Sequence, residues 1–262
     1  MMKNAVDLAR VVVVVLSVIV ASIPVVAQDV AVEEAPPEPL WESSLGLSYV
    51  ATTGNTETST FGLDFSSKRR PDPWGLDLMA TFTRAEDGKT LTAEQYLVGG
   101  RALRQVGDRW SVFAGLSWAR DTFSGFENRW IVEAGGEYLA IDSGSQRLAF
   151  DLGLTWTSED RILFDELTQE EFTETFDWLG AVAGLTWEWT ISDSASLTER
   201  LLYYPNFDES SDWRLASDTA LKASLTKLLA LQLSYQVRYR NLPIDNNEKT
   251  DTTTKMSVVL NF

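Results

Sequence analysis

Apolar and polar residues alternate along residues 229–262, at the end of the chain. Between Leu229 and Arg240, Leu, Tyr and Val occupy the odd positions, and Gln, Ser and Arg occupy the even positions from 232 onward. After a polar interval the alternation resumes and ends on Phe262. A period of two places the two sets on opposite faces of a β-strand. The pattern therefore predicts a closing β-hairpin with one apolar and one polar face.

Strand-like segments of this kind recur from Leu45 to the end of the chain. Twelve are expected, at residues 45–53, 58–69, 74–85, 93–105, 110–120, 128–141, 147–157, 173–191, 196–204, 213–225, 229–241 and 251–262. Several carry aromatic residues at both ends of an aliphatic face, as between Trp110 and Trp118. Such faces are typical of strands that contact lipid, with aromatic girdles at the two membrane surfaces.

The connections between these segments alternate in length. Short ones are expected at residues 71–73, 107–108, 142–146, 192–195 and 226–227, and long ones at residues 85–92, 121–127, 158–172, 205–212 and 242–250. Only the tight turn at residues 54–57 breaks the rule. Outer-membrane barrels have short periplasmic turns and longer external loops. The sequence therefore predicts an all-β fold, a transmembrane antiparallel up-and-down β-barrel of about 12 strands, formed by residues 45–262.

Residues 1–27 have the pattern of a secretory signal peptide. Lys3 and Arg10 accompany an aliphatic run, and small residues lie before Gln28. An uncleaved membrane anchor is the alternative, although Pro24 interrupts the run. Residues 28–44 are acidic and rich in proline, which favours a flexible periplasmic leader. Export followed by lipid-facing strands indicates the outer membrane of a Gram-negative bacterium.

Composition narrows the classes of function. The formal net charge of -16 argues against nucleic acid as a partner, because phosphates require a basic surface. The chain contains no Cys, so it has no disulfide, and no His, the commonest metal ligand and the usual proton acceptor near neutral pH. Its 10 Trp, 7 Tyr and 12 Phe are consistent with a lipid-facing barrel.

The polar faces of the strands predict the lining of the barrel interior. The expected lining residues are Asp64, Lys68, Asp77, Glu133, Glu137, Asp151, Glu188, Arg214, Asp218, Lys222, Arg238, Arg240 and Lys255. Basic residues concentrate in the last three strands, opposite strands in which acidic residues dominate. One interpretation is a narrow polar channel with a transverse field that selects small solutes. The other is an interior filled by its own paired side chains.

Metal and enzyme chemistry receive little support. The acidic segment 158–172 lacks the spacing of a calcium loop, so no metal site and no cofactor are expected. Nucleophilic catalysis usually needs a histidine base, which is absent. Two alternatives stay open: an outer-membrane enzyme acting on lipid, for example through Glu133 and Asp151, and a soluble periplasmic barrel that binds an apolar ligand. The leading prediction is a non-enzymatic barrel of structural or narrow-channel type.

Four sequence segments resemble a known bacterial family. They are Gly54-Asn55-Thr56-Glu57-Thr58, Tyr203-Tyr204-Pro205-Asn206, Leu233-Ser234-Tyr235-Gln236-Val237-Arg238-Tyr239 and Glu248-Lys249-Thr250-Asp251-Thr252-Thr253. In that order they are similar to the family labelled salt-induced outer membrane protein, or domain of unknown function 481. The resemblance covers nearly all of the chain after the leader. It implies an outer-membrane β-barrel and a link to salt or envelope stress, but it supplies no catalytic or binding residues.

The final strand also resembles a recognition signal. Its alternate positions Met256, Val258, Leu260 and Phe262 are similar to the carboxy-terminal signal read by the barrel-assembly machinery. The resemblance implies that this machinery is a partner during biogenesis. The other expected partners are outer-membrane lipid and lipopolysaccharide.

Overall fold

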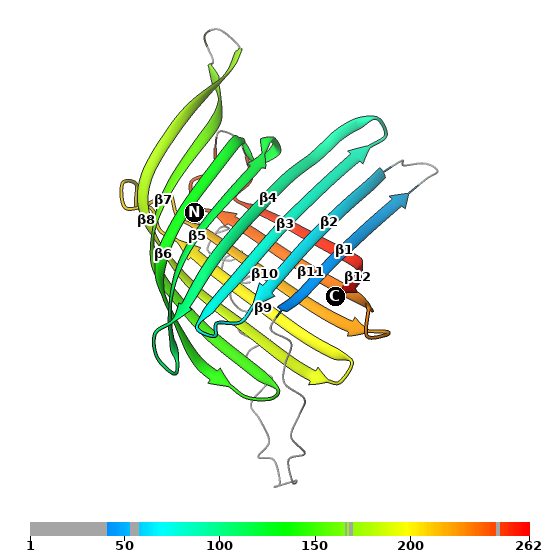
Figure 1. Ribbon diagram of the computed structural model, residues 1–262. Coiled ribbons are helices and arrows are strands. Elements are labelled where there is room, and N and C mark those ends of the chain that lie inside the picture. Colours follow the sequence, from blue (N-terminus) through cyan, green and yellow to red (C-terminus); the bar gives the residue numbers. More distant parts are fainter. Residues whose placement is uncertain (1–40, 53–57, 166, 168–169, 245–246) are drawn as a thin grey trace, which may run out of the picture. The chain divides into compact units, whose positions relative to one another are not determined.

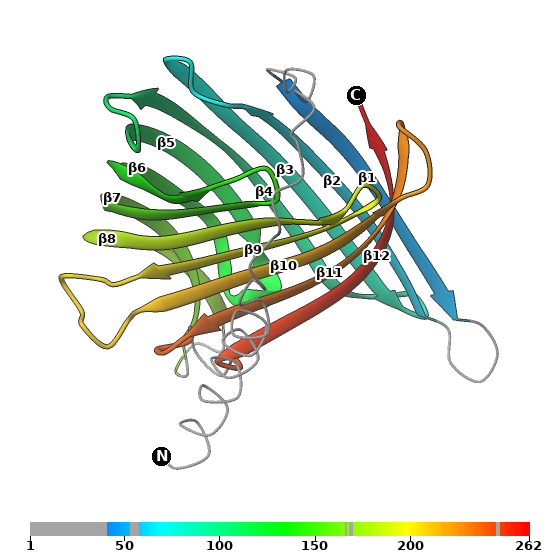
Figure 2. The same cartoon turned by 90° about the horizontal axis from the view of Figure 1, so that it is seen from below.

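The described part of the chain forms a closed barrel of twelve antiparallel strands (Figure 1). The computed structural model describes residues 41–52, 58–165, 167, 170–244 and 247–262. The strands are β1 (Trp41–Thr52), β2 (Thr58–Arg69), β3 (Trp74–Asp87), β4 (Thr90–Gln105), β5 (Trp110–Asp121), β6 (Phe126–Asp142), β7 (Gln146–Asp165), β8 (Glu170–Ser192), β9 (Ala195–Tyr204), β10 (Arg214–Ser224), β11 (Leu229–Arg240) and β12 (Thr250–Asn261). They follow one another around the barrel in sequence order (Figure 2), and β1 pairs with β12. The predicted fold class is confirmed.

The two faces of each strand differ in exposure, as the alternation predicted. On β12 the side chains of Met256 and Val258 are exposed on the outer face, whereas Lys255 is buried inside. Directly opposed residues of an antiparallel pair share a face, so pairing carries this division from strand to strand. Leu231, for example, lies opposite Val258 and is also exposed. No helix among the described residues is long and apolar enough to cross a membrane.

Aromatic side chains form a continuous row on the outer face from β2 to β6. Ring centroids lie 6.0 Å apart for Phe61 and Phe82, 4.9 Å for Phe82 and Tyr96, 6.4 Å for Tyr96 and Trp118, and 6.3 Å for Trp118 and Trp130. At the other end of β5 and β6, the rings of Trp110 and Tyr138 are 4.8 Å apart. Rings gathered at two levels are the pattern of a protein that meets two membrane–water interfaces.

The two ends of the barrel differ in their connections. We call the end where β1 begins and β12 finishes the terminal end, and the opposite end the loop end. At the terminal end, strands are joined by residues 70–73, 106–109, 143–145, 193–194 and 225–228. The loop end carries the connections at residues 88–89, 122–125, 205–213 and 241–249, among others. The predicted turn at residues 54–57 lies outside the described residues.

Two of the predicted long loops are largely strand. Most of residues 158–172 belongs to β7 and β8, which continue as a paired hairpin that stands clear of the barrel body (Figure 1). Similarly, β3 and β4 extend into residues 85–92 and leave a tight turn, in which Gly88 has a φ of 61°. In these segments the strand ladder continues between backbone N–H and C=O groups, whose pairing does not depend on which side chains the residues carry.

The start of the barrel also differs from the prediction. β1 begins at Trp41, so residues 41–44 of the predicted leader belong to the first strand. The predicted signal peptide, residues 1–27, and the rest of the leader lie outside the described residues.

Candidate functional site

A chamber of about 250 Å³ lies in the terminal half of the barrel interior. Lys68, Asp77, Glu137, Arg147 and Glu188 are among the charged side chains that line it. Lys68 Nζ donates a hydrogen bond to Glu188 Oε1 at 2.5 Å, and Arg147 Nη2 donates to Glu137 Oε1 at 3.3 Å. Because β2 and β8 lie on opposite sides of the barrel, the first of these ion pairs spans the interior. The chamber is therefore a polar space bridged by side chains.

Arg101 on β4 joins two carboxylates at the wall of this chamber. Its Nε donates to Glu133 Oε1 at 2.8 Å, and its Nη1 donates to Asp151 Oδ2 at 2.8 Å. The guanidinium carbon also lies 4.1 Å from the centre of the Phe113 ring. Removing ions from water is costly, and this arrangement offsets the cost with two opposite charges and a ring face. Glu133 and Asp151, the predicted alternative catalytic pair, are thus both held by one cation.

An apolar cluster lies next to Arg101. Leu103, Phe113, Val182 and Leu202 are buried against one another and come from β4, β5, β8 and β9. Leu103 and Leu202 also line the chamber, so the cluster forms part of its wall. Packed apolar side chains leave few voids larger than a water molecule. The cluster therefore obstructs this side of the interior.

Two glycines on the intervening strands make room for the Phe113 ring. A Cβ atom on Gly135 would lie 2.8 Å from Phe113 Cζ and 2.2 Å from the carbonyl oxygen of Leu152. A Cβ atom on Gly153 would lie 3.1 Å from the same Cζ. Such close approach is a common reason for glycine inside a strand. The ring consequently covers the inner wall of β6 and β7.

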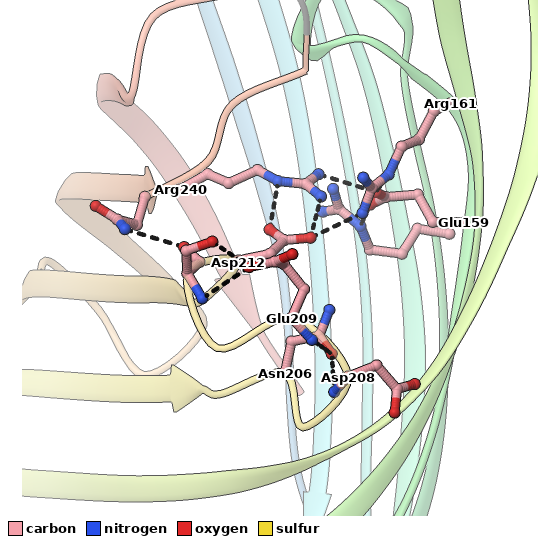
Figure 3. Close-up of polar contacts among 10 residues, drawn as sticks. Glu159, Arg161, Asn206, Asp208, Glu209, Asp212 and Arg240 are labelled. Carbon is pink, nitrogen blue, oxygen red and sulfur yellow. Dashed lines mark hydrogen bonds and ion pairs between the residues drawn. The ribbon is translucent and has the colours of Figure 1, made fainter.

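A second charged network lies at the loop end (Figure 3). Glu159 is fully buried, forms an ion pair with Arg129, and accepts hydrogen bonds from Arg161 Nε at 2.8 Å and Arg240 Nη1 at 2.9 Å. Asp212 lies between the same two arginines: Arg161 Nη2 donates to it at 2.8 Å, and Arg240 donates through Nε and Nη2 at 3.0 and 2.9 Å. Forked arginine–carboxylate bonds of this kind are strong and fix geometry. The network ties β6, β7 and β11 to one loop.

The loop between β9 and β10 carries Asp212 into this network. Asn206 Oδ1 accepts hydrogen bonds from the backbone nitrogens of Asp208 at 2.9 Å and Glu209 at 3.2 Å, as Figure 3 shows. The Asp212 nitrogen then donates to the Glu209 carbonyl at 2.9 Å. Side-chain-stabilised turns hold a loop in one shape. The loop is thus fixed with the Asp212 carboxylate buried at the loop end.

Ion pairs on the opposite side of the barrel are more exposed. Arg238 and Asp218 are 2.7 Å apart, and each side chain is 34% exposed, compared with 4% for Asp151 in the pair with Arg101. In the Lys255–Asp64 pair, whose Nζ and Oδ1 atoms lie 2.7 Å apart, the Asp64 side chain is 28% exposed and that of Lys255 is 3% exposed. The interior is therefore asymmetric. The Arg238–Asp218 pair and the chamber-spanning Lys68–Glu188 pair, at 27% and 29%, are its more exposed ion pairs, whereas the networks of Arg101 and Glu159 are buried.

The remaining predicted lining residues lie on the same inner faces. The Arg214 guanidinium lies 5.5 Å from the ring centres of both Trp178 and Tyr204. Lys222 shares a face of β10 with Asp218 and Arg214, because these positions are separated by even numbers of residues. Their role in transport or packing stays a prediction.

Several interior charges were missed by the sequence analysis. They are Arg101, Arg129, Arg147, Glu159, Arg161 and Asp212. Glu159 and Arg161 continue the alternation of β7 from Asp151, so extending the period past Thr157 would have found them. Arg101 lies in residues 93–105, a segment with weak alternation. Asp212 lies in a loop, where no period indicates direction.

The described residues contain no group of three or more acidic side chains arranged to hold a metal ion. Carboxylates of the predicted acidic loop bind protein groups instead. Asp160 accepts hydrogen bonds from Asn128 Nδ2 at 3.1 Å and Thr175 Oγ1 at 2.7 Å. Asp160 and Glu159, two acidic residues of this segment, are therefore hydrogen-bonded to other side chains of the protein.

Comparison with known sequences identifies relatives of this chain. Residues 45–262 match the sequence profile of a family described as "Protein of unknown function, DUF481". The chain is also 25% identical over 221 residues to the uncharacterized protein YdiY of Escherichia coli (strain K12). That alignment covers 83% of this chain and 82% of YdiY.

Comparison with solved structures finds barrels of low sequence identity. An outer membrane channel from Pseudomonas putida F1 is 13% identical, with a TM-score of 0.49, and covers 90% of this chain and 100% of its own. The NanC porin is 11% identical, with a TM-score of 0.44, and covers 84% and 97%. The translocator domain of the autotransporter NalP from Neisseria meningitidis is 10% identical, with a TM-score of 0.43, and covers 85% and 86%. At these identities the likeness concerns the fold alone.

Proposed function

This chain belongs to the DUF481 family, and we propose that it is an outer-membrane barrel with a narrow aqueous channel for small polar solutes. The supporting observation is the asymmetry of its interior. Side chains of the Arg238–Asp218 pair are 34% exposed, whereas Glu159 at the other side is fully buried. Water therefore reaches the inner face of the barrel beside Arg238 and Asp218. The channel runs along this wetter side, past the packed cluster around Phe113.

The outer membrane is the environment that this geometry fits. The exposed outer face is apolar at Met256, Val258 and Leu231, and aromatic rows flank it at two levels. Each strand pairs with a neighbour on both sides, so most strand backbone groups are satisfied internally, as hydrocarbon requires. In this orientation the terminal end faces the periplasm and the long β7–β8 hairpin faces outward. A link to salt stress stays a prediction of the family resemblance.

The channel wall carries adjacent charges of both signs. Arg238 Nη2 and Asp218 Oδ1 lie 2.7 Å apart, so each screens the other and neither sign dominates locally. Removing one member leaves the other as an unscreened charge beside the path. Charges that line a pore set its ion selectivity. The pair therefore allows a test in which two substitutions have opposite effects.

The test is ion selectivity in planar bilayers under a salt gradient. Arg238→Gln leaves Asp218 unscreened and shifts the reversal potential toward cation selectivity. Asp218→Asn leaves Arg238 unscreened and shifts it toward anion selectivity. Arg120→Gln is the matched control, because it removes a charge from β5 on the outer face, and it leaves selectivity unchanged.

Two outcomes overturn the channel. Folded barrels that give no conductance events support the runner-up, a sealed structural barrel, which the lumen-spanning Lys68–Glu188 pair and the Phe113 cluster favour. Conductance in which both substitutions shift selectivity in the same direction would place the path elsewhere. Slower migration of boiled than of unboiled samples on detergent gels verifies that each variant is folded.

A further inference from the structure

The seam that closes the barrel is shorter than the strands that form it. β1 and β12 pair over four strand positions, from Ser44 opposite Asn261 to Leu47 opposite Val258, and Ser43 and Phe262 exchange two backbone hydrogen bonds at the end of this ladder. By contrast, β1 pairs with β2 along its whole length, and β12 pairs with β11 from Thr250 to Leu260. Toward the loop end, β1 and β12 run apart in both views (Figure 1, Figure 2). Both strands therefore have one unshared edge beyond the last rung.

An ion pair replaces the ladder on the inner side of this gap. Lys255 on β12 reaches past β1 to β2, where its Nζ lies 2.7 Å from Asp64 Oδ1. Its stem passes Gly62, since a Cβ atom there would lie 3.5 Å from Lys255 Cδ. The Lys255 side chain is 3% exposed and lies along the inner side of the seam. This contact does not satisfy the backbone groups of the two strand edges.

Two serines beside Lys255 are buried without partners. Ser48 on β1 and Ser257 on β12 are the next inward-facing positions after the last rung, and they are 6% and 2% exposed. Neither hydroxyl has a hydrogen-bond partner among the described atoms. Burying a hydroxyl without a hydrogen-bond partner costs roughly 1–3 kcal/mol compared with leaving it in water. Beside the gap, the Lys255 ammonium group and the two serine hydroxyls can therefore form further hydrogen bonds.

The outer side of the same gap is apolar. Leu47 and Tyr49 on β1, and Met256 and Val258 on β12, have exposed side chains on the lipid-facing surface. Hydrocarbon offers no hydrogen bonds to strand edges, so an open seam in a membrane needs a polar partner. A molecule with a polar head and an acyl chain fits both sides of the gap at once.

We propose that the gap between residues 48–52 of β1 and 253–257 of β12 is a lateral binding site for an acyl amphiphile. Its carboxylate or ester head accepts hydrogen bonds from Lys255, Ser48 and Ser257, and its chain lies outward against Tyr49 and Met256. Lys255 has three N–H donors, so it donates to the head group either alongside its hydrogen bond to Asp64 or in place of that bond. The site requires a membrane location but not the aqueous channel.

Quenching by brominated acyl chains tests the site, because the chain has no native Cys. In full-length protein in vesicles, a bimane label on Ser257→Cys is quenched even though this position faces inward. The matched control is Gln232→Cys, which lies directly opposite on β11, also faces inward, and stays unquenched. Quenching by brominated phospholipid identifies bilayer lipid as the occupant. Quenching only by added brominated fatty acid identifies the free acid, and equally weak quenching of both labels with both probes overturns the proposal.

Substituting each member of the Lys255–Asp64 ion pair provides a second test, in which the two variants change ligand binding in opposite directions. Lys255→Gln weakens binding of the brominated acid or lipid roughly tenfold, the effect of losing one charge-assisted hydrogen bond. Asp64→Asn frees the ammonium group and tightens binding. If the ion pair is purely structural, both substitutions lower the free energy of unfolding, and quenching is the same as in the unsubstituted protein.

Disulfide trapping tests the gap without any ligand. Ser44→Cys with Asn261→Cys forms a disulfide quickly, because these inward-facing residues are directly paired. Ser48→Cys with Ser257→Cys forms one slowly, and brominated acid slows it further. Equal rapid formation in both pairs shows a closed seam and rules out the site.

Discussion

At the residue scale, the interior is organised by arginines whose partners come from distant positions in sequence. The period of two correctly orients Glu133 and Asp151, since the face of a residue depends only on its place in a strand. It does not identify Arg101 as their partner. That contact depends on which strands lie near each other inside the closed barrel and on their relative stagger. Neither the proximity of the strands nor their stagger can be read from the sequence of a single strand.

Replacing Arg101 tests its role as a shared partner. Arg101→Met leaves two carboxylates facing each other without a cation, and it lowers the free energy of unfolding by about 3–5 kcal/mol. Urea titration of the refolded protein in vesicles measures the change. Arg120→Gln, on the outer face with a half-exposed partner at 3.9 Å, is the control and has little effect. Equal stability of both variants would mean that the Arg101 contacts are not maintained in the membrane.

The glycine beneath Phe113 allows a second residue-level prediction. Gly135→Ala forces a Cβ atom against the backbone of Leu152 and the Phe113 ring, so it destabilises the barrel by about 1–3 kcal/mol. Gly144→Ala, at a turn with nothing within 4 Å, is the matched control and is nearly neutral. The midpoints of thermal unfolding in detergent compare the two variants. A neutral Gly135→Ala would show that the ring does not rest on this wall.

At the scale of elements, the strands were predicted well and the β7–β8 hairpin was not. Inside the membrane an outer face must be apolar, so the alternation marks the strand. Beyond the membrane both faces meet water, and residues such as Glu170 and Glu171 resemble a loop although they are paired. The prediction failed at the point where the requirement for an apolar face ends.

Shortening this hairpin tests whether its outer part is independent of the barrel. Leu163 and Phe172 are opposite each other, so the segment between them can be replaced by an Asn-Gly turn that suits a two-residue hairpin. We expect the variant to fold and to keep heat-modifiable migration, because the buried Glu159 network lies below the cut. Loss of the folded band would show that the outer hairpin supports the network.

At the scale of the whole molecule, one polarity pattern and the lengths of the connections were enough to predict the closed barrel. Most strand ends lie within a few residues of their predicted positions. The uneven interior could not be predicted in the same way. Packing against Phe113 on one side and water beside Arg238 on the other result from side-chain volumes summed across several strands.

The last residue provides a test that separates assembly from stability. The Phe262 side chain is 70% exposed, while its backbone nitrogen donates to the Ser43 carbonyl at 2.9 Å. Phe262→Ala keeps the backbone contact and removes only the ring. If the ring is an assembly signal, the variant accumulates less in the outer membrane of cells but refolds normally in detergent. Phe207→Ala, an exposed aromatic residue at the loop end, is the control. Equal accumulation of both variants would contradict the signal.

The short seam also has a consequence for the order in which the molecule forms. Every other pairing joins neighbours in sequence, so hairpins can form early from local contacts. Closure must bring Ser44 to Asn261, at the two ends of the barrel sequence, and it gains only four strand pairings and the Ser43–Phe262 backbone bonds. Until then the sheet has two free edges that can pair with other chains. Closure is therefore the slow step of folding, and the time spent before it determines how much of the protein is lost to aggregation.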